Sequence, residues 1–174
     1  MLMQSGSTND IIEFCLKEVR QPRPKWNTVV PVGVARTELS ADGLWEVLGD
    51  VEAWPDWSPL HRAVAWQQGS ALTVGARFEQ QLDLGFPVGR TTEQVTLALA
   101  EPGRRAGWTG DKGGVRSCHV WAFTPTPDGG TEVSNVEALT GFPIALVHPF
   151  VARRWQRQFQ AAAEGLVAAA EGHR

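Results

Sequence analysis

Apolar residues recur with two different periods along this 174-residue chain, and the change of period separates its helical parts from its strands. From Asp10 to Val19 they fall three and four residues apart, which predicts a short amphipathic helix. Pro22 and Pro24 then favour an extended connector. We therefore treat residues 1–27 as a helical leader and residues 28–174 as the domain itself. The leader could pack on the domain or on a second subunit, or stay loose.

The segment from Thr28 to Leu39 is rich in valine and predicts a first strand. Ser40 has a side chain that caps helices, and the residues after it form an apolar face with helical spacing. Residues 50–59 should form a second short helix, interrupted by Pro55 and Pro59.

A series of alternating runs bounded by glycine and proline follows, which is typical of a meander of antiparallel strands. The runs cover about residues 63–67, 76–84, 88–99, 104–109, 115–124 and 131–141. Between the last two, Asp128-Gly129-Gly130 predicts a tight hairpin turn, because these residues accept a positive φ.

The last segment returns to a helical period. From Val151 to Ala169 apolar residues follow one another at steps of three and four, and arginines lie on the other faces, which predicts a long helix over about residues 149–170. Pro149 fits the first turn of this helix, or a kink after a shorter turn that begins at Pro143.

The predicted element order is one strand, two short helices, about six further strands and a long C-terminal helix, which defines an α+β fold. An antiparallel sheet of about seven strands twists and curls. A long helix on its concave face cannot fill all the space beneath it. We therefore expect an apolar cavity between the sheet and the C-terminal helix.

Composition excludes several classes of function. The hydrophobic content of 43% suits one domain with a real core, and a net charge of −3 does not suit a surface that wraps nucleic acid. No run approaches the roughly 20 apolar residues of a membrane-spanning helix, so no stable membrane insertion is expected. The polar N-terminus differs from a secretory signal and favours a cytoplasmic location.

Cysteine and histidine give no sign of a metal site. Cys15 and Cys118 are too few and too far apart for a disulfide framework or a zinc knuckle, so we interpret both as ordinary buried or half-buried thiols. The four histidines lack the spacing of zinc ligands, and there is no glycine-rich phosphate loop. Neither a metal nor another cofactor is expected.

The element order and a tryptophan- and proline-rich turn resemble the polyketide cyclase/dehydrase-type branch of the START-like, or SRPBCC, superfamily. The resemblance is carried by Trp45, Leu48, Asp50, Trp54, Pro55, Trp57 and Pro59, and by residues 75–78, 119–123 and 130–133. It implies the helix-grip fold and a small hydrophobic ligand. It does not select a function, because carriers, binders and enzymes share this scaffold. The chain has no tyrosine, so a family mechanism that uses a tyrosine hydroxyl is excluded.

Strand alternation places several polar side chains on mainly apolar, inward faces. These are Gln80, Glu93, His119, Asn135 and Glu137. A polar group in a core costs a few kcal/mol unless it is hydrogen-bonded, so each should pair with another group or with a ligand. His119 and Glu137 could approach each other across neighbouring strands and are the candidate acid–base pair. The alternatives are a satisfied core histidine and a solvated strand end.

Large aromatic side chains complete the candidate site, because the late strands and the closing helix should face each other. The predicted ligand-binding residues are Trp57, Phe78, Gln80, Glu93, Trp108, His119, Trp121, Glu137, Trp155 and Phe159.

Three functions remain open at this point. The first is binding of a small hydrophobic or aromatic molecule, such as a lipid, polyketide or isoprenoid. The second is a polyketide aromatase/cyclase or dehydrase that uses an acid or base in the cavity. The third is a protein-interaction module, which a solid core without a cavity would favour. A homodimer is also left open.

Overall fold

The computed structural model describes residues 7–172, which form an open antiparallel sheet with helices on both faces. The helices are α1 (Thr8–Glu18), α2 (Ala41–Gly49), the 3-10 turn η1 (Val51–Ala53), α3 (Trp54–Trp57) and α4 (Phe142–Gly172). The strands are β1 (Thr28–Val29), β2 (Val32–Thr37), β3 (His61–Gln68), β4 (Arg77–Asp83), β5 (Arg90–Glu101), β6 (Arg105–Lys112), β7 (Val115–Pro125) and β8 (Thr131–Thr140).

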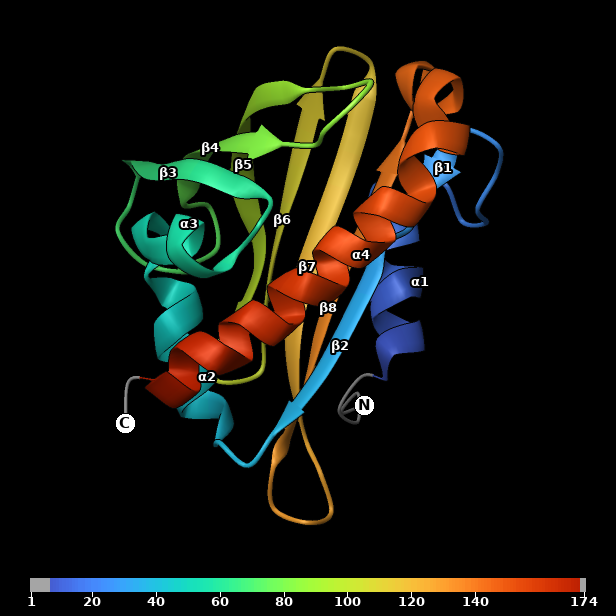
Figure 1. The fold of residues 1–174 in the computed structure, drawn as a ribbon. Coiled ribbons are helices and arrows are strands. Elements are labelled where there is room, and N and C mark those ends of the chain that lie inside the picture. The colour runs from blue at the N-terminus through green and yellow to red at the C-terminus, as the bar shows by residue number, and fades with distance from the viewer. Residues whose placement is uncertain (1–6, 173–174) are drawn as a thin grey trace.

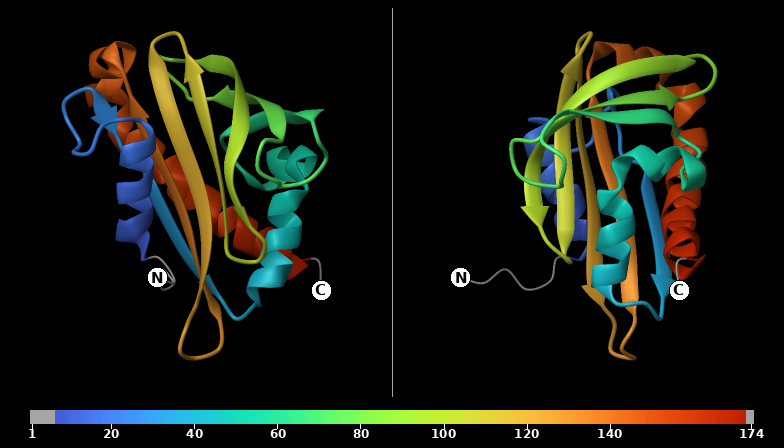
Figure 2. Two further views of the ribbon diagram at one scale, coloured as in Figure 1. Left: turned by 180° about the vertical axis from the view of Figure 1, so that it is seen from behind. Right: turned by 90° about the vertical axis from the view of Figure 1, so that its left-hand side faces the viewer.

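The sheet has the strand order β1-β8-β7-β6-β5-β4-β3, and β2 also pairs with β8. Consecutive strands from β3 to β8 are neighbours, as the predicted meander requires. Figure 1 shows α4 running diagonally across one face of the curved sheet, and Figure 2 shows α1 on the opposite face. This arrangement confirms the predicted helix-grip fold.

Two element boundaries differ from the predicted ones, and proline explains both. The first strand is split into β1 and β2, which both pair with β8, because Pro31 has no N–H to give to the ladder. Helix α4 begins at Phe142, not near residue 149, which agrees with the alternative of a shorter turn from Pro143 followed by a kink at Pro149. Pro143 occupies the first turn, and Pro149 lies inside the helix, where the first turns meet the rest at an angle (Figure 1).

Helix α1 covers the outer face of the sheet, so the leader packs on its own domain. Its buried residues meet the outward side chains of β7 and β8 in a separate apolar cluster. There Cys15 Sγ lies 3.3 Å from Cys118 Sγ, and both thiols are free. Its hydrogen bond to Cys118 and burial raise the pKa of Cys15 far above its usual range, so this thiol stays protonated and unreactive.

The main core lies between the inner face of the sheet and α4. Two glycines let the helix approach closely: a Cβ on Gly33 would lie 2.1 Å from the Phe159 carbonyl oxygen, and one on Gly165 would lie 2.1 Å from that of Trp57. Any larger residue at either position would push α4 away from β2 or α3. The helix is therefore held firmly over one half of the inner face.

Candidate functional site

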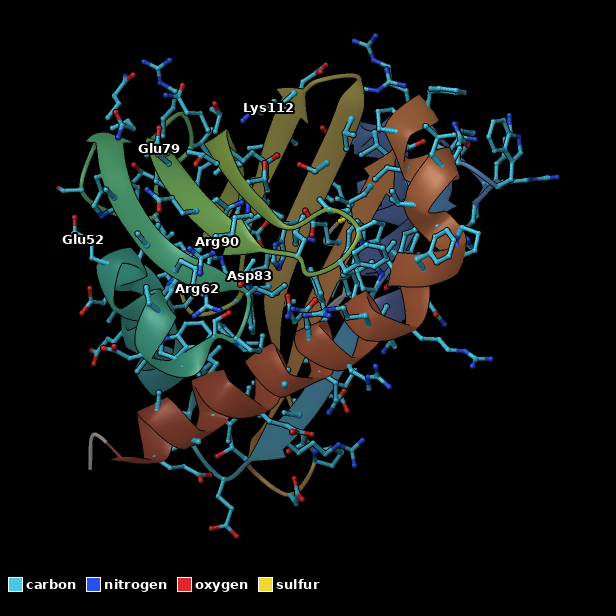
Figure 3. All side chains as sticks on the ribbon, turned by 45° about the horizontal axis from the view of Figure 1, so that its top comes forward. Glu52, Arg62, Glu79, Asp83, Arg90 and Lys112 are labelled. Atoms are coloured by element: carbon cyan, nitrogen blue, oxygen red, sulfur yellow. The ribbon has the colours of Figure 1, made fainter. Side chains whose placement is uncertain are left out.

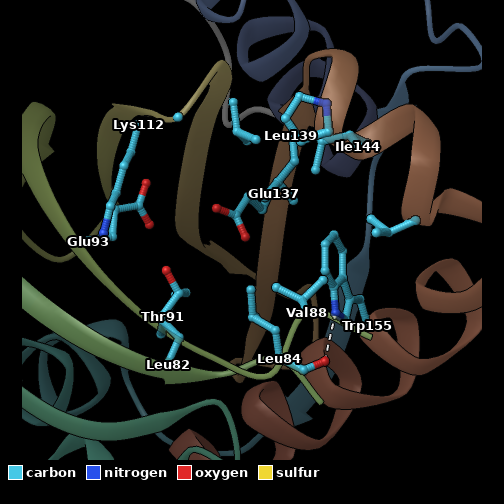
Figure 4. A pocket seen from close by; sticks show the side chains of 14 residues that line it. Leu82, Leu84, Val88, Thr91, Glu93, Lys112, Glu137, Leu139, Ile144 and Trp155 are labelled. Atoms are coloured by element: carbon cyan, nitrogen blue, oxygen red, sulfur yellow. Dashed lines mark hydrogen bonds between the residues drawn. The ribbon is translucent and has the colours of Figure 1, made fainter. Parts of the chain in front are cut away.

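A cavity of about 410 Å³ lies at the other half, under the first turns of α4. It is bounded by the ends of β4, β5 and β8 and by the β6–β7 hairpin (Figure 4). Its lining is mainly apolar, with four polar side chains among fourteen residues: Leu82, Leu84, Val88, Thr91, Glu93, Lys112, Gly113, Val115, Glu137, Leu139, Pro143, Ile144, Val147 and Trp155. A volume in this range suits a small organic molecule.

The local periods of strands and helix explain why these side chains meet. Residues two apart on a strand share a face, which turns Thr91 and Glu93 inward from β5, and Glu137 and Leu139 inward from β8. Further along α4, the Trp155 indole N–H donates a 3.1 Å hydrogen bond to the Leu84 carbonyl, which fixes the position of the indole ring beside the cavity (Figure 4).

Glu137 is the chemically distinctive residue of the cavity. Desolvation raises its pKa well above the usual carboxyl value, and the nearby charge of Glu93 raises it further. Among the described residues, none makes a hydrogen bond or an ion pair with its carboxyl group. In Figure 4 the two carboxyl groups point toward one another across the cavity. The raised pKa favours the protonated carboxyl group, which is the form that can donate a hydrogen bond.

Glu93 is held by a directed chain of hydrogen bonds that crosses the sheet from α3. Its two oxygens accept from the Gln80 amide at 3.2 Å and from the Ser117 hydroxyl at 2.9 Å. Because the Gln80 nitrogen donates to Glu93, its oxygen must accept from His61 Nε2, 3.3 Å away. His61 Nδ1 then accepts from the Ser58 hydroxyl at 2.7 Å. Each group in this series of hydrogen bonds donates toward Glu93, whose carboxylate accepts the last one.

Two buried histidines stay neutral: His61, which belongs to this series of hydrogen bonds, and His119. Desolvation lowers the pKa of His61 to about 4, although its hydrogen bond to Gln80 opposes the shift. Desolvation also lowers the pKa of His119 to about 3, against the opposing effect of its hydrogen bond to Asn135. Neither ring is protonated near neutral pH, so neither supplies a positive charge to the cavity.

His119 and Glu137 lie opposite each other on neighbouring strands, but their side chains have different surroundings. Their Cα atoms are directly paired in register. His119 Nε2 nevertheless lies 2.6 Å from Asn135 Oδ1, and the Asn135 amide donates to the Phe159 carbonyl at 3.1 Å. The His119 ring also contacts the Trp108 and Phe159 rings. His119 is thus enclosed in the core, whereas Glu137 faces the cavity.

The structure distributes the predicted site residues over three places. Glu93, Glu137 and Trp155 line the cavity. Trp57 borders a separate depression between α2 and the C-terminal part of α4. The remaining predicted residues fill the inner face beside the cavity; they are Phe78, Gln80, Trp108, His119, Trp121 and Phe159. Whether any of the ten contacts a ligand stays a prediction.

Most residues that line the cavity are not among those predicted from the sequence. Strand alternation could have predicted four of them, because they point to the same face as the predicted site residues on their strands: Leu82, Leu84, Thr91 and Leu139. Pro143, Ile144 and Val147 were missed because the helix was predicted to begin near residue 149. Lys112 comes from a hairpin tip, where strand parity gives no direction, and its ammonium group donates to the Thr92 carbonyl.

Residues 7–172 contain neither a cluster of metal ligands nor a membrane-spanning helix. No three side chains of His, Cys, Asp or Glu in this range are grouped in a way that could hold a metal ion. No helix in the same range is long and apolar enough to cross a bilayer.

A curved antiparallel sheet around a long C-terminal helix, with a cavity between them, defines a helix-grip domain. Residues 32–171 match the family described as polyketide cyclase / dehydrase and lipid transport, so the chain belongs to this family. This confirms the resemblance, and membership supports a ligand-binding or cyclase role. None of the curated proteins is significantly similar to the chain in sequence.

Solved structures with the same fold include uncharacterised proteins and enzymes. A hypothetical protein of Helicobacter pylori has a TM-score of 0.73 at 17% identity, covering 98% of this chain and 99% of that one. The Zhui aromatase/cyclase of a Streptomyces species has a TM-score of 0.63 at 15% identity, covering 83% and 94%. Norcoclaurine synthase of Thalictrum flavum has a TM-score of 0.62 at 16% identity, covering 84% and 88%. At these identities the likeness shows the fold.

Proposed function

We propose that the protein binds a small, mainly apolar molecule with an acceptor oxygen, such as a ketone of polyketide, lipid or isoprenoid type, in the cavity under α4. The observation that carries this proposal is the Glu137 carboxyl group, which faces a mainly apolar cavity, has a pKa raised by desolvation and is without a partner among the described residues. A guest with an acceptor oxygen gives the protonated carboxyl group a hydrogen bond in mainly apolar surroundings, worth about 0.5–1.5 kcal/mol. The apolar lining adds about 25 cal/mol per Å² buried.

The test compares two probes of similar shape, acetonaphthone and naphthalene, by fluorescence titration. Acetonaphthone accepts a hydrogen bond and donates none, so its binding needs the proton on Glu137. Its affinity should fall as the pH rises through the raised pKa of Glu137. Glu137→Gln keeps a donor and should remove this pH dependence. Glu137→Leu should lower the affinity for acetonaphthone about tenfold relative to the affinity for naphthalene, because one hydrogen bond is lost.

Glu79→Leu is the matched control, because Glu79 lies next to Gln80 on β4 and points to the opposite face (Figure 3). It should leave both affinities unchanged. Equal losses for the two probes in Glu137→Leu would contradict the role of Glu137. Failure of the unchanged protein to bind either probe would contradict the proposed function.

A second candidate function is cyclisation or dehydration of a polycarbonyl chain, and the pair of facing carboxyl groups favours it. The Glu93 carboxyl accepts two hydrogen bonds, and the raised pKa of Glu137 favours its protonated form, which suits a general base and a general acid. Glu93 would take a proton from the carbon between two carbonyls. Glu137 would give its proton to the carbonyl oxygen that becomes a hydroxyl as the carbon–carbon bond forms. Loss of that hydroxyl as water, protonated by Glu93 while Glu137 takes the α-proton, restores both groups.

Binding and catalysis are separated by product analysis with a linear triketone. If the enzyme role holds, Glu93→Gln and Glu137→Gln should each abolish the cyclised, dehydrated product while the triketone still binds. If the unchanged protein forms no product above the buffer rate, only the binding function stands.

A further inference from the structure

The first turns of α4 are apolar on both sides, although only one side is covered. Ile144 and Val147 turn inward and line the cavity. Phe142, Leu146 and Phe150 follow at steps of four along another side and are 67%, 62% and 66% exposed. A helix that is apolar all round is normally buried in protein or in lipid. Here the outer side of such a helix faces solvent.

Other exposed aromatic residues gather at the same end of the molecule. Phe86 is 82% exposed in the β4–β5 turn, and the Gly85 backbone in this turn lies against the Arg154 side chain of α4. Trp26 is also exposed, and the residue after it accepts a 3.1 Å hydrogen bond from the Gly141 N–H, just before α4. Figure 1 shows these segments together at the end where the cavity lies.

This apolar surface is bordered by positive charge, although the chain as a whole is acidic. Residues 142–163 contain Arg153, Arg154 and Arg157 and no carboxylate, whereas the net charge of the chain is −3. All three arginines are exposed. Lys112 stands at the tip of the neighbouring hairpin (Figure 3).

The carboxylates near this surface are few, and the opposite end holds many. Asp83, at the end of β4, already pairs with Arg62 at 2.8 Å and Arg90 at 3.9 Å (Figure 3). Asp111 is the exposed carboxylate beside the hairpin tip. The segment from α2 to α3 carries a run of acidic residues: Asp42, Glu46, Asp50, Glu52 and Asp56. The molecule is therefore electrically polarised, with its basic end around the cavity.

We propose that Phe86, Phe142, Leu146 and Phe150 form a docking surface that binds the face of an anionic lipid bilayer. Apolar side chains of a basic amphipathic helix insert at the boundary of head groups and acyl chains, and the arginines lie at the level of the phosphates. Docking here is peripheral and needs no membrane-spanning segment. Because Pro143, Ile144 and Val147 lead from this helix directly into the cavity, an apolar guest could pass between bilayer and cavity without crossing water.

Charge favours a bilayer over a second copy of the chain as the occupant. In a two-fold symmetric dimer the same surface meets itself, so the three arginines of one copy would face those of the other. No acidic cluster at this end could balance them, because the acidic run lies on α2 and α3. A bilayer that contains anionic lipid supplies the missing negative charge.

The test is co-sedimentation with vesicles of phosphatidylcholine and phosphatidylglycerol, compared with vesicles of phosphatidylcholine alone. The unchanged protein should bind the anionic vesicles, and added salt should weaken binding. Combined Phe142→Ser, Leu146→Ser and Phe150→Ser should lower the partition coefficient at least about tenfold. Val74→Ser is the matched control, because Val74 is 67% exposed in the β3–β4 loop, and it should have no effect.

Charge reversal separates the electrostatic part. Arg153→Glu with Arg157→Glu should weaken binding by about fivefold for each arginine removed, while Arg104→Glu at the β5–β6 turn should not. All the changed side chains are exposed, so the fold should be retained, and circular dichroism checks this.

Two results would overturn the proposal. One is equal partitioning of the unchanged protein and the triple serine variant. The other is a dimer in sedimentation velocity that the triple variant abolishes, with no vesicle binding, since the surface would then join two copies. Docking requires no guest in the cavity, so failure of docking and failure of ligand binding are distinguishable.

Discussion

The inner face of the sheet has two halves that are built on the same strands but filled differently. On β4, Phe78 is fully buried in one half, whereas Leu82, four residues on, borders the cavity in the other. On β8, Val133 is fully buried and Glu137 faces the cavity. Residues on one face of the same strand thus belong to the packed core in one half and border a cavity in the other.

The filled half is held by an aromatic cluster under α4. Trp54 stacks on Trp108 with 5.2 Å between ring centroids, and Phe78 meets both rings edge-on at 5.3 Å. Such contacts leave no room for a guest and add to the stability that apolar burial provides. The open half keeps a half-buried carboxyl group, Glu137, that has no partner among the described residues and whose pKa desolvation raises. Proteins often separate the residues that stabilise the fold from those of a site, because the requirements of a site can lower stability.

The largest effect should come from removing a ring in the filled half. Trp108→Ala should lower the free energy of unfolding by about 4 kcal/mol, because it leaves a large cavity in close-packed surroundings. Val147→Ala, in the open half, should cost only about 1 kcal/mol, because its side chain already borders empty space. Urea unfolding measures both, and similar costs for the two variants would show that the halves do not differ.

The next largest effect should come from acid, which should destabilise the filled half. His61 and His119 have ordinary pKa values of 6.5 and folded pKa values of about 4 and about 3, so the unfolded chain takes up protons first. Stability is therefore fully present above pH 6.5 and is lost as the pH falls toward the folded values. Each group adds a slope of up to about 1.4 kcal/mol per pH unit. In His119→Gln, the melting temperature should change less steeply with pH; an unchanged slope would show that His119 is not held neutral.

The open half should respond to pH with the opposite sign. The raised pKa of Glu137 means that the folded protein keeps a proton which the unfolded chain releases above its ordinary pKa of 4.5. Its contribution is present below that value and is lost as the pH rises through the folded pKa. Glu137→Gln, which has no proton to lose, should thus be more stable than the unchanged protein in alkaline buffer. Thermal unfolding across the pH range measures this, and a destabilised variant would contradict a protonated Glu137.

The smallest effect should come from adding volume. Val147→Phe should change the free energy of unfolding by less than about 1 kcal/mol, because the cavity has space for the ring. Ala106→Val, in the filled half, should cost about 1–3 kcal/mol through overpacking. Val147→Phe should also block acetonaphthone binding. Chemical unfolding and titration test both outcomes, and unchanged binding in Val147→Phe would place the guest elsewhere.

The sequence predicted the features that depend on local periodicity. Alternation of side chains along a strand placed Glu93 and Glu137 on the inner face, and both line the cavity. The hairpin at Asp128-Gly129-Gly130 was predicted because its turn residues act locally, and β7 and β8 are paired on either side of it. Such features need no knowledge of distant contacts.

The division of the inner face into two halves depends on distant contacts instead. The side chains of His119 and Glu137 point to the same face of the sheet from directly paired positions on β7 and β8. Asn135 and the rings of Trp108 and Phe159 nevertheless enclose only His119. Which half α4 covers closely is set by Gly33 and Gly165, far apart in the chain. No local pattern reveals this.

The most direct test of a guest-binding open half is nuclear Overhauser spectroscopy of the acetonaphthone complex with methyl-labelled protein. We predict contacts between the probe and the methyl groups of Leu84, Leu139, Ile144 and Val147, and none with those of Val95, Leu97 and Val133 in the filled half. Contacts confined to the filled half or to the outer surface, or no contacts under saturating probe, would contradict the account.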